Sequence, residues 1–568
     1  MAASVAPALQ GARTRPPWSR QRAAFLALMA LVCGAFAASW LGIHMGFFSL
    51  FTGIGNIVHF VGQNLPPQFV DFPRIANEAL ITLCIAVLGT AFSMVLAVPV
   101  GFAAASNTTP HRAVRWVARS VIVACRAVPD LVFAIIFVEA LGVGVLPGVL
   151  ALAFHSIGML GKVFADNIEQ VPPRQTEAVK STGASRWQVM MTGIVPEVLP
   201  TFSSVALYRL DINLRSSVIL GYVGAGGIGF LLNEYMGELQ FRAAMGIVIV
   251  MFVLVVSMEV VAAVVRRSLI GLENQPVGAA VSARARGARR SSSASGRLGP
   301  WGGAASFDPR TLRPPWTRTR VQRFCFVAGA LAVIVASFVV TKTTPWQAFE
   351  SLGKIWHTVT LYFPPNFETE GTSLLTGALQ SLAVAVIATL GGYFFALPIG
   401  LLAARNVSRP WEARTARLLL VVIRAVPELV IAIVFIVAVG LGLVAGALAL
   451  TVGTVGFLAK LVADNIEEVS PAPREAVVSA GATKPQEIAT SVLTPALPML
   501  VGNGLYMLDI NFRSVTILGI VGGGGIGYIL WQSVNILAYK TTGAIIILTF
   551  VVVVVIEGLT NWVRKYLI

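Results

Sequence analysis

Charged side chains lie inside the apolar runs of this sequence, at matching places in its two halves. Each half has an arginine and an acidic residue four positions apart, and later an acidic residue and an arginine with the same spacing. A charge at the centre of a membrane span costs about 2.5–3.5 kcal/mol, so we expect these side chains to face a cavity or a partner. The residues are Arg126, Asp130, Asp211 and Arg215 in the first half and Arg424, Glu428, Asp509 and Arg513 in the second.

Arginine suits an anionic solute, because its planar fork of N–H donors matches the oxygens of phosphate. Arg126 and Asp130 are four residues apart, as are Asp211 and Arg215, so we expect each pair to share one helical face and to form an ion pair. Pro129 should loosen the helix locally. Two interpretations stay open for these residues: they line a pathway and contact an anion, or they form self-neutralising or gate-closing salt bridges.

Other charged residues lie elsewhere along the apolar runs. A lysine and an aspartate four residues apart occur where an inner span should end, and they suit either a cytoplasmic gate or a solvated helix end. Each half also has one glutamate in its last apolar run, which we interpret as a hydrogen-bonded structural carboxyl. The gate candidates are Lys162, Asp166, Lys460 and Asp464, and the glutamates are Glu259 and Glu557.

The sequence predicts no catalytic, cofactor or metal site. Gly224–Gly229 and Gly522–Gly527 fit G-x-G-x-x-G, but each follows an apolar run and opens no βαβ unit, so we expect a flexible turn or tight helix packing. The motif G-x-x-x-x-G-K-[ST] does not occur, so any ATP and Mg²⁺ would bind another polypeptide. The histidines lack metal-ligand spacing, and the four separated cysteines predict packed thiols.

Composition indicates a polytopic membrane protein. Of the 568 residues, 56% are hydrophobic and 12% are charged, and the mean hydropathy is +0.79; soluble proteins carry about 25% charged residues. The net charge of +16 would suit nucleic acid, but the basic residues gather at the ends of apolar runs and in one linker. The positive-inside rule explains that distribution, so we expect no nucleic-acid partner and place both termini in the cytoplasm.

The chain divides into two similar halves. We expect a basic tail at 1–22, a membrane domain at 23–267, a flexible basic linker at 268–322 near anionic membrane lipids, and a second membrane domain at 323–568. Each half should contain about six spans, so the two repeats are parallel and related by an axis along the membrane normal. A basic start and an apolar run at 24–43 would also fit a cleavable signal peptide, but we expect a retained span, because the second half opens in the same way internally.

A polar stretch occurs twice between the apolar runs, at 177–200 and at 475–498. Each copy predicts a short helix, a break at glycine and a second short helix, a shape that fits a groove on a soluble partner. Each begins with Glu-Ala, has glycine six residues after the glutamate and ends with Leu-Pro, which resembles the EAA loop of binding-protein-dependent ABC importer permeases. Valine replaces the family's third-position alanine, and Pro485 should shorten the second helix. The resemblance assigns ATPase coupling to Glu177, Ala178, Gly183, Glu475, Ala476 and Gly481.

A wider pattern resembles the phosphonate-type branch of type I ABC importer permeases. It includes RAVPDLV at 126–132, RAVPELV at 424–430 and the stretches at 155–169, 207–230 and 505–528. The resemblance implies an all-α type I ABC importer transmembrane fold in a bacterial cell membrane, and a transport permease with no enzymatic site of its own. It also implies two ABC ATPase copies that bind ATP and Mg²⁺, a lipid-anchored or periplasmic-type solute-binding protein, and phosphonate, phosphite or phosphate as cargo. The family usually supplies as separate subunits the two copies that are fused here.

Two other functions remain alternatives. The same ABC machinery would serve an amino acid or an osmolyte. A proton-coupled secondary carrier would use Asp130, Asp211 and Glu259 as a relay. However, the loop after the second span lacks the Gly-x3-Asp-Arg pattern of the major facilitators.

Overall fold

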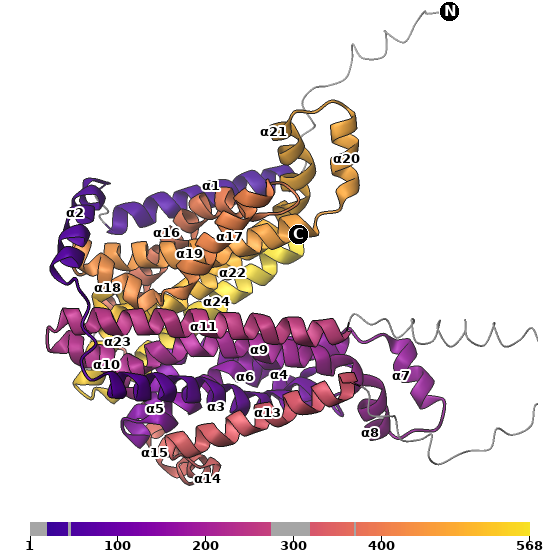
Figure 1. The fold of residues 1–568 in the computed structure, drawn as a ribbon, viewed down its shortest axis with the longest axis horizontal. Helices are drawn as coiled ribbons and strands as arrows, with labels where there is room; N and C mark the ends of the chain where they lie inside the picture. The colour runs from indigo at the N-terminus through magenta and orange to yellow at the C-terminus, as the bar shows by residue number, and fades with distance from the viewer. Residues whose placement is uncertain (1–19, 44–46, 274–317, 369–370, 568) are drawn as a thin grey trace, which may run out of the picture. The chain divides into compact units, whose positions relative to one another are not determined.

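The computed structural model describes residues 20–43, 47–273, 318–368 and 371–567, and regular structure within these ranges is helical (Figure 1). Most of the predicted tail and linker lies outside them. The helices of the first half are α1 (Arg20–Ile43), α2 (Phe47–Gln63), α3 (Phe72–Ala104), α4 (Arg112–Ala127), α5 (Asp130–Leu141), α6 (Val145–Glu169), α7 (Pro173–Lys180), α8 (Arg186–Val189), α9 (Val195–Leu220), α10 (Ile228–Gly237) and α11 (Phe241–Glu273).

The second half repeats this order of helices with small changes at its start. Four π-helical turns, η1 (Met190–Ile194), η2 (Gly221–Ala225), η4 (Ile488–Leu493) and η5 (Gly519–Gly523), flank α9 and its counterpart α22. The α-helices are α13 (Arg318–Thr341), α14 (Pro345–Glu350), α15 (Leu352–Leu361), α16 (Gly371–Ala403), α17 (Pro410–Ala425), α18 (Glu428–Val439), α19 (Leu443–Glu468), α20 (Pro471–Ser479), α21 (Lys484–Glu487), α22 (Thr494–Leu518), α23 (Gly525–Asn535) and α24 (Tyr539–Leu567).

Long apolar helices confirm the prediction of an all-α polytopic membrane protein. Within the described ranges, nine helices are long and apolar enough to span a membrane, or up to eleven if each of two bent pairs counts as one span. The segment Cys33–Ile43 of α1 is a shorter apolar helix by the same test. The helices α3 and α16 have 33 residues each, which is about 50 Å at 1.5 Å per residue. Both therefore exceed the ~30 Å apolar core of a bilayer.

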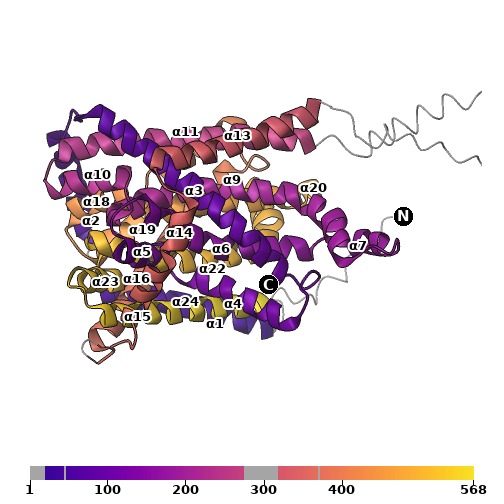
Figure 2. The same cartoon turned by 90° about the horizontal axis from the view of Figure 1, so that it is seen from below.

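The helices form two compact units that do not follow the order of the chain. One unit combines residues up to 63 with residues from 361 onward, and the other contains residues 64–360. In the first of these, α1 packs on α16 and α2 on α18 (Figure 1), where the Asn56 side-chain amide donates to the Ala438 carbonyl at 2.9 Å. In the other, α13 runs beside α3 (Figure 2), with the Phe92 and Phe338 rings 6.1 Å apart. The opening helices of each sequence half thus pack with the later helices of the other half.

Small residues allow the central helices of each unit to pack closely, as is usual between membrane helices. At Gly101 of α3, an added Cβ would lie 2.8 Å from the Cβ of Phe164 on α6. At Gly400 of α16, an added Cβ would lie 2.6 Å from the Val462 side chain on α19. These contacts make α3–α6 and α16–α19 the core pairs of their units.

The two G-x-G-x-x-G segments are tight turns between helices, as the sequence predicts. Each joins a π-helical turn to a short helix, α10 or α23. A Cβ at Gly229 would overlap the Val218 carbonyl oxygen, and one at Gly527 would overlap the Thr516 carbonyl oxygen. The backbone that follows each turn is also bonded to α3 or α16, since Ile228 N donates to Thr82 Oγ1 at 2.8 Å and Ile526 N donates to Ser381 Oγ at 2.9 Å. These glycines are needed for close packing.

Candidate functional site

Each repeated polar stretch folds into an exposed segment at the end of a helix bundle. We call residues 173–194 the first coupling segment and residues 471–493 the second. The first consists of α7, a turn, α8 and η1, and the second of α20, a turn, α21 and η4 (Figure 1). None of the residues of α7 or α20 is buried, so both helices present their polar faces outward. The predicted coupling residues Glu177, Ala178, Glu475 and Ala476 are all exposed.

Glycine sets the turn inside each coupling segment. Gly183 has φ +80° and Gly481 has φ +81°, while an added Cβ would meet nothing within 4 Å at either residue. The conformation is therefore the constraint, since a residue other than glycine in the left-handed region costs about 1–3 kcal/mol. The next helix is capped in both copies: Ser185 and Gln188 exchange side-chain and backbone hydrogen bonds, and Thr483 forms the same capping box.

Pro485 does not shorten the second coupling segment, so that prediction is wrong. The helices α8 and α21 both have four residues. Pro485 lies in the first turn of α21, where a backbone N–H has no partner within the helix and proline is tolerated.

An ionic clamp holds the second coupling segment, and the sequence analysis missed it. Arg474 of α20 donates through Nε to the Glu487 carboxylate at the end of α21 and through Nη1 to the Asn406 carbonyl. The Glu487 side chain is only 7% exposed. At the equivalent positions, 298 residues earlier (474 − 298 = 176; 487 − 298 = 189), the first coupling segment has Thr176 and Val189. The clamp therefore belongs to the second repeat.

A second ion pair occurs in both repeats and was also missed. Arg119 Nη2 lies 3.0 Å from Glu169 Oε1, which also accepts from the Ser106 backbone at 2.7 Å. In the second repeat, Arg417 lies 2.7 Å from Glu467. The repeated Asp-Asn-Ile-Glu sequence at the ends of α6 and α19 was the available signal. The pairs join the middle of α4 and of α17 to the C-terminal ends of α6 and α19.

Arg126 and Asp130 do not share a helical face, contrary to our prediction. The helices α4 and α5 meet at an angle of 90°, and α17 and α18 meet at 83°. Val128 is extended and Pro129 occupies the N-cap position before α5, because proline lacks an N–H and restricts the residue before it. Asp130 therefore begins a new helix, where its Oδ1 accepts from the Leu131 N–H at 2.9 Å and its charge is favourable for the helix dipole.

The same break in the second repeat separates Arg424 from Glu428. The acidic residue and its neighbour on the next helix change size in opposite directions between the repeats. His155 of α6 lies beside the shorter Asp130 segment, with its Nδ1 3.3 Å from the Val128 carbonyl oxygen. At Gly453, the equivalent position, an added Cβ would lie 3.1 Å from the longer Glu428 carboxylate.

Asp211 and Arg215 form the predicted ion pair within α9. Arg215 Nη2 lies 2.5 Å from Asp211 Oδ2, and their side chains are 22% and 8% exposed. Arg513 and Asp509 pair in the same way in α22. Within the described ranges, the Nε atoms of Arg215 and Arg513 are buried and have no hydrogen-bond partner. Both guanidinium groups thus retain donor capacity beside a buried carboxylate.

A buried asparagine joins three helices in each unit. Asn213 of α9 accepts from Ser156 of α6 at 3.1 Å and donates to Thr90 of α3 at 2.9 Å. Asn511 makes the same bonds to Thr454 and Thr389, with the same two distances. We call these the asparagine clasps. The first has an additional member, the buried Arg209, whose Nε donates to Ser156 Oγ at 2.7 Å, whereas Met507 occupies the equivalent position in the second.

The other predicted residues lie on long helices near the surface of their units. Lys162 and Asp166 are exposed on α6, and Lys460 is exposed on α19, where Asp464 is half-buried. Glu259 and Glu557 are half-buried on α11 and α24. The gate assignment therefore stays a prediction.

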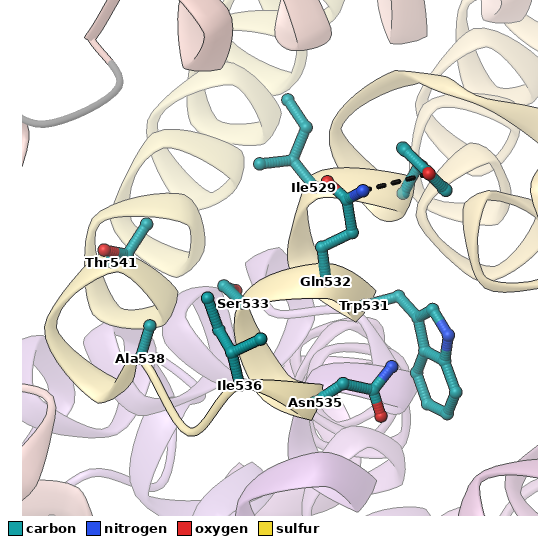
Figure 3. Close-up of a pocket in the computed structure, with 9 residues that line it drawn as sticks. Ile529, Trp531, Gln532, Ser533, Asn535, Ile536, Ala538 and Thr541 are labelled. Carbon is teal, nitrogen blue, oxygen red and sulfur yellow. Dashed lines mark hydrogen bonds between the residues drawn. The ribbon is translucent and has the colours of Figure 1, made fainter.

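The two repeats differ in charge around α10 and its counterpart α23. In the first, Arg74 of α3 forms two hydrogen bonds to Glu234 of α10, at 3.0 and 2.7 Å. In the second, a cavity of about 520 Å³ lies where α23 meets α24 (Figure 3). Its lining includes Trp531, and Gln532 donates to the Tyr528 hydroxyl at 2.9 Å. The first repeat thus has the Arg74–Glu234 ion pair here, whereas the second has a hydrogen bond between the neutral side chains of Gln532 and Tyr528.

Within the residues that the structure describes, no three His, Cys, Asp or Glu side chains are placed to hold a metal ion. The four cysteines are free, but they are not uniformly packed as predicted. Cys84 is buried, Cys125 is half-buried, and Cys33 and Cys325 are exposed.

Comparisons with known proteins agree with this arrangement. The family model for the binding-protein-dependent transport system inner membrane component matches residues 97–271 and again residues 396–567. The phosphate-import permease protein PhnE of Mycolicibacterium smegmatis is 44% identical over 521 residues, which cover 92% of this chain and 91% of the relative. The phosphite transport system permease protein PtxC of Stutzerimonas stutzeri is 39% identical over 44% of this chain and 90% of its own length.

One solved chain, from the MetNI methionine ABC transporter in an inward-facing conformation, is 25% identical and has a TM-score of 0.33; the match covers 35% of this chain and 99% of that chain. The PtxC match likewise places almost a whole permease within less than half of this chain. Two permease copies are therefore joined here, and the chain belongs to the family of binding-protein-dependent transport system inner membrane components.

Proposed function

We propose that this chain forms the complete membrane channel of an ATP-driven importer for phosphonate, phosphite or phosphate. The observation that carries the proposal is the repeated, exposed helix–glycine–helix segment at Gly183 and Gly481. Each coupling segment would dock on one of two ATPase subunits, which bind ATP and Mg²⁺. A solute-binding protein outside the membrane would deliver the cargo. Both termini would lie in the cytoplasm.

The cargo assignment rests on the relatives together with the charged side chains. The two relatives described above carry phosphate and phosphite in their names. Arg215 and Arg513 hold partly buried guanidinium groups beside Asp211 and Asp509, and such groups bind tetrahedral oxyanions well. Arg126, Asp130, Arg424 and Glu428 would line the same pathway near the helix breaks. Lys162, Asp166, Lys460 and Asp464 would form the inner gate.

The proposed cycle is alternating access. ATP binding would draw the ATPase subunits together, and the coupling segments would transmit that movement to α9 and α22 through η1 and η4. The coupled movement of α9 and α22 would then expose the pathway to the solute-binding protein.

The coupling assignment can be tested at Gly183. Gly183→Pro removes the φ of +80° and should stop uptake while the partner ATPase still hydrolyses ATP. Gly183→Asn is the matched control, because asparagine tolerates the left-handed region, and it should retain uptake. Glu177→Lys should uncouple transport in the same way as Gly183→Pro. ATP-driven uptake at the wild-type rate in both Gly183→Pro and Glu177→Lys would refute the assignment.

The cargo and the energy source need a separate measurement. Uptake of phosphate, phosphite, an alkylphosphonate and methionine into cells that carry the full transporter should favour the three phosphorus oxyanions. Preference for methionine or an osmolyte would support the amino-acid alternative. Uptake that needs a proton gradient, from a chain that purifies without an ATPase, would support the secondary carrier.

A further inference from the structure

An apolar groove lies beside the first coupling segment, between α3 and the start of α9. Its volume is about 510 Å³, and Ser203 is the one polar residue in its lining. Three methionines line it, Met94 from α3 and Met190 and Met191 from η1. Trp187 of α8 also lines the groove and is 62% exposed. The groove thus joins a membrane-spanning helix to the segment that is proposed to meet the ATPase.

The second repeat has a tyrosine at the position of Met94. Thr90 and Thr389 make matching bonds in the asparagine clasps and set the register here (389 − 90 = 299), so Met94 corresponds to Tyr393. The Tyr393 hydroxyl donates to the Leu500 carbonyl, across from α16 to α22. A Cβ added at Gly504 would lie 2.9 Å from the tyrosine ring. The side chain at this position therefore differs between the repeats, and in the second repeat its ring packs closely on α22.

The walls of the groove continue into an exposed apolar surface. Val95 and Leu96 of α3 are 72% and 41% exposed, and Leu199 of α9 is 56% exposed. In a helix that spans a membrane, such side chains are suited to contact with hydrocarbon. The volume lies within the range of small-molecule sites, and the unbranched methionine side chains adapt to a flexible occupant.

Basic residues lie on the same segment as one wall of the groove, and their charge favours an anionic occupant. The first coupling segment carries Arg174, Lys180 and Arg186, and Arg186 directly precedes Trp187. The second coupling segment has no matching basic cluster, because the residues at the equivalent positions are Ala472, Val478 and Lys484. Tryptophan and basic side chains together are typical of the boundary between hydrocarbon and lipid headgroups.

We infer that the groove binds one acyl chain of an anionic phospholipid, with the headgroup held by Lys180 and Arg186. This inference goes beyond the proposed transport function, because it assigns a lipid site that is independent of the cargo. The bound chain lies beside Met94, at the position where the second repeat has Tyr393, and it supports the first coupling segment from the membrane side.

Fluorescence quenching by brominated lipid tests the inference directly. The full-length protein is placed in nanodiscs that contain phosphatidylglycerol with bromine atoms on its acyl chains. The contribution of Trp187 is the difference between the wild type and Trp187→Phe. That difference should be strongly quenched in the wild type, and it should lose most of its quenching in Met94→Tyr, which introduces the side chain of the second repeat. Met94→Leu is the matched control and should keep the quenching.

Three results would overturn the inference. The first is a Trp187 signal that brominated lipid does not quench, and the second is quenching that persists in Met94→Tyr. The third is protection of Trp187 by the bound ATPase alone, which would make the groove part of a protein interface. Equal quenching by brominated phosphatidylcholine would overturn the role of Lys180 and Arg186.

Discussion

The two coupling segments have the same backbone but different support. In the second, the Arg474–Glu487 pair joins α20 to α21, and Tyr393 crosses from α16 to α22. In the first, a threonine and a valine occupy the positions of the ion pair, and Met94 beside the apolar groove takes the place of the tyrosine. Glycines and capping boxes determine the path of both segments, whereas the neighbouring side chains determine how each segment is held. A duplicated motif can thus keep its shape while its two copies come to depend on different contacts.

The asparagine clasps provide the largest expected effect, because they are the part that the repeats share. Asn213 is 0% exposed and Asn511 is 2% exposed. Asn213→Leu and Asn511→Leu each remove two buried hydrogen bonds, and each buried group left without a partner costs about 1–3 kcal/mol. The free energy of unfolding, measured by SDS titration of the purified chain, should fall by similar amounts in both variants.

The exposed Asn535 provides the control for the asparagine clasps, and Asn535→Leu should leave the unfolding free energy nearly unchanged. A large loss in one clasp variant and none in the other would show that the repeats are not equivalent where α9 and α22 cross their partners. In that case Arg209, which only the first clasp contains, would be the first residue to examine.

The Arg474–Glu487 clamp should give the next largest effect, and only in the second repeat. Arg474→Thr leaves a carboxylate whose side chain is 7% exposed with Lys484 at 3.4 Å as its remaining partner. The thermal midpoint of the purified chain should fall by a few degrees, because removing one partner of a buried ion pair is more harmful than replacing both.

The double variant Arg474→Thr with Glu487→Val carries the residues of the first repeat and should recover most of the lost stability. A double variant that is less stable than Arg474→Thr would mean that the carboxylate has another role. Uptake measured on the same variants would show whether the clamp also matters for coupling.

Much of the fold and of the coupling site could be predicted from the sequence. The apolar runs identify the membrane helices, and the glycine six residues after Glu177 and Glu475 places a turn where the structure has one. The Asp211–Arg215 pair was also predicted, because an i, i+4 spacing within one uninterrupted helix leaves little freedom.

The remaining features depend on contacts that a linear pattern does not contain. Pro129 is compatible with a kinked helix or with a complete break, and only packing on α6 selects the 90° break. The exchange of α1 and α13 between units has no local signal, since any apolar helix can cover α3 or α16. Tyr393 and Met94 look like equivalent core positions until the hydrogen bond to Leu500 is known.

The Arg119–Glu169 and Arg417–Glu467 ion pairs should give the smallest effect, and they allow one more comparison of the two repeats. The side chains of Arg119 and Glu169 are 47% and 28% exposed, and those of Arg417 and Glu467 are 33% and 29% exposed. Exposed ion pairs contribute about 0.2–1 kcal/mol, so Arg119→Gln and Arg417→Gln should each lower the unfolding free energy by no more than that. The loss should shrink at high salt, which screens exposed charges. A larger, salt-insensitive loss in one variant would mean that its arginine hydrogen bond to the carbonyl of Ala104 or Ala403 holds the helix end, and the repeats would then differ at this contact as well.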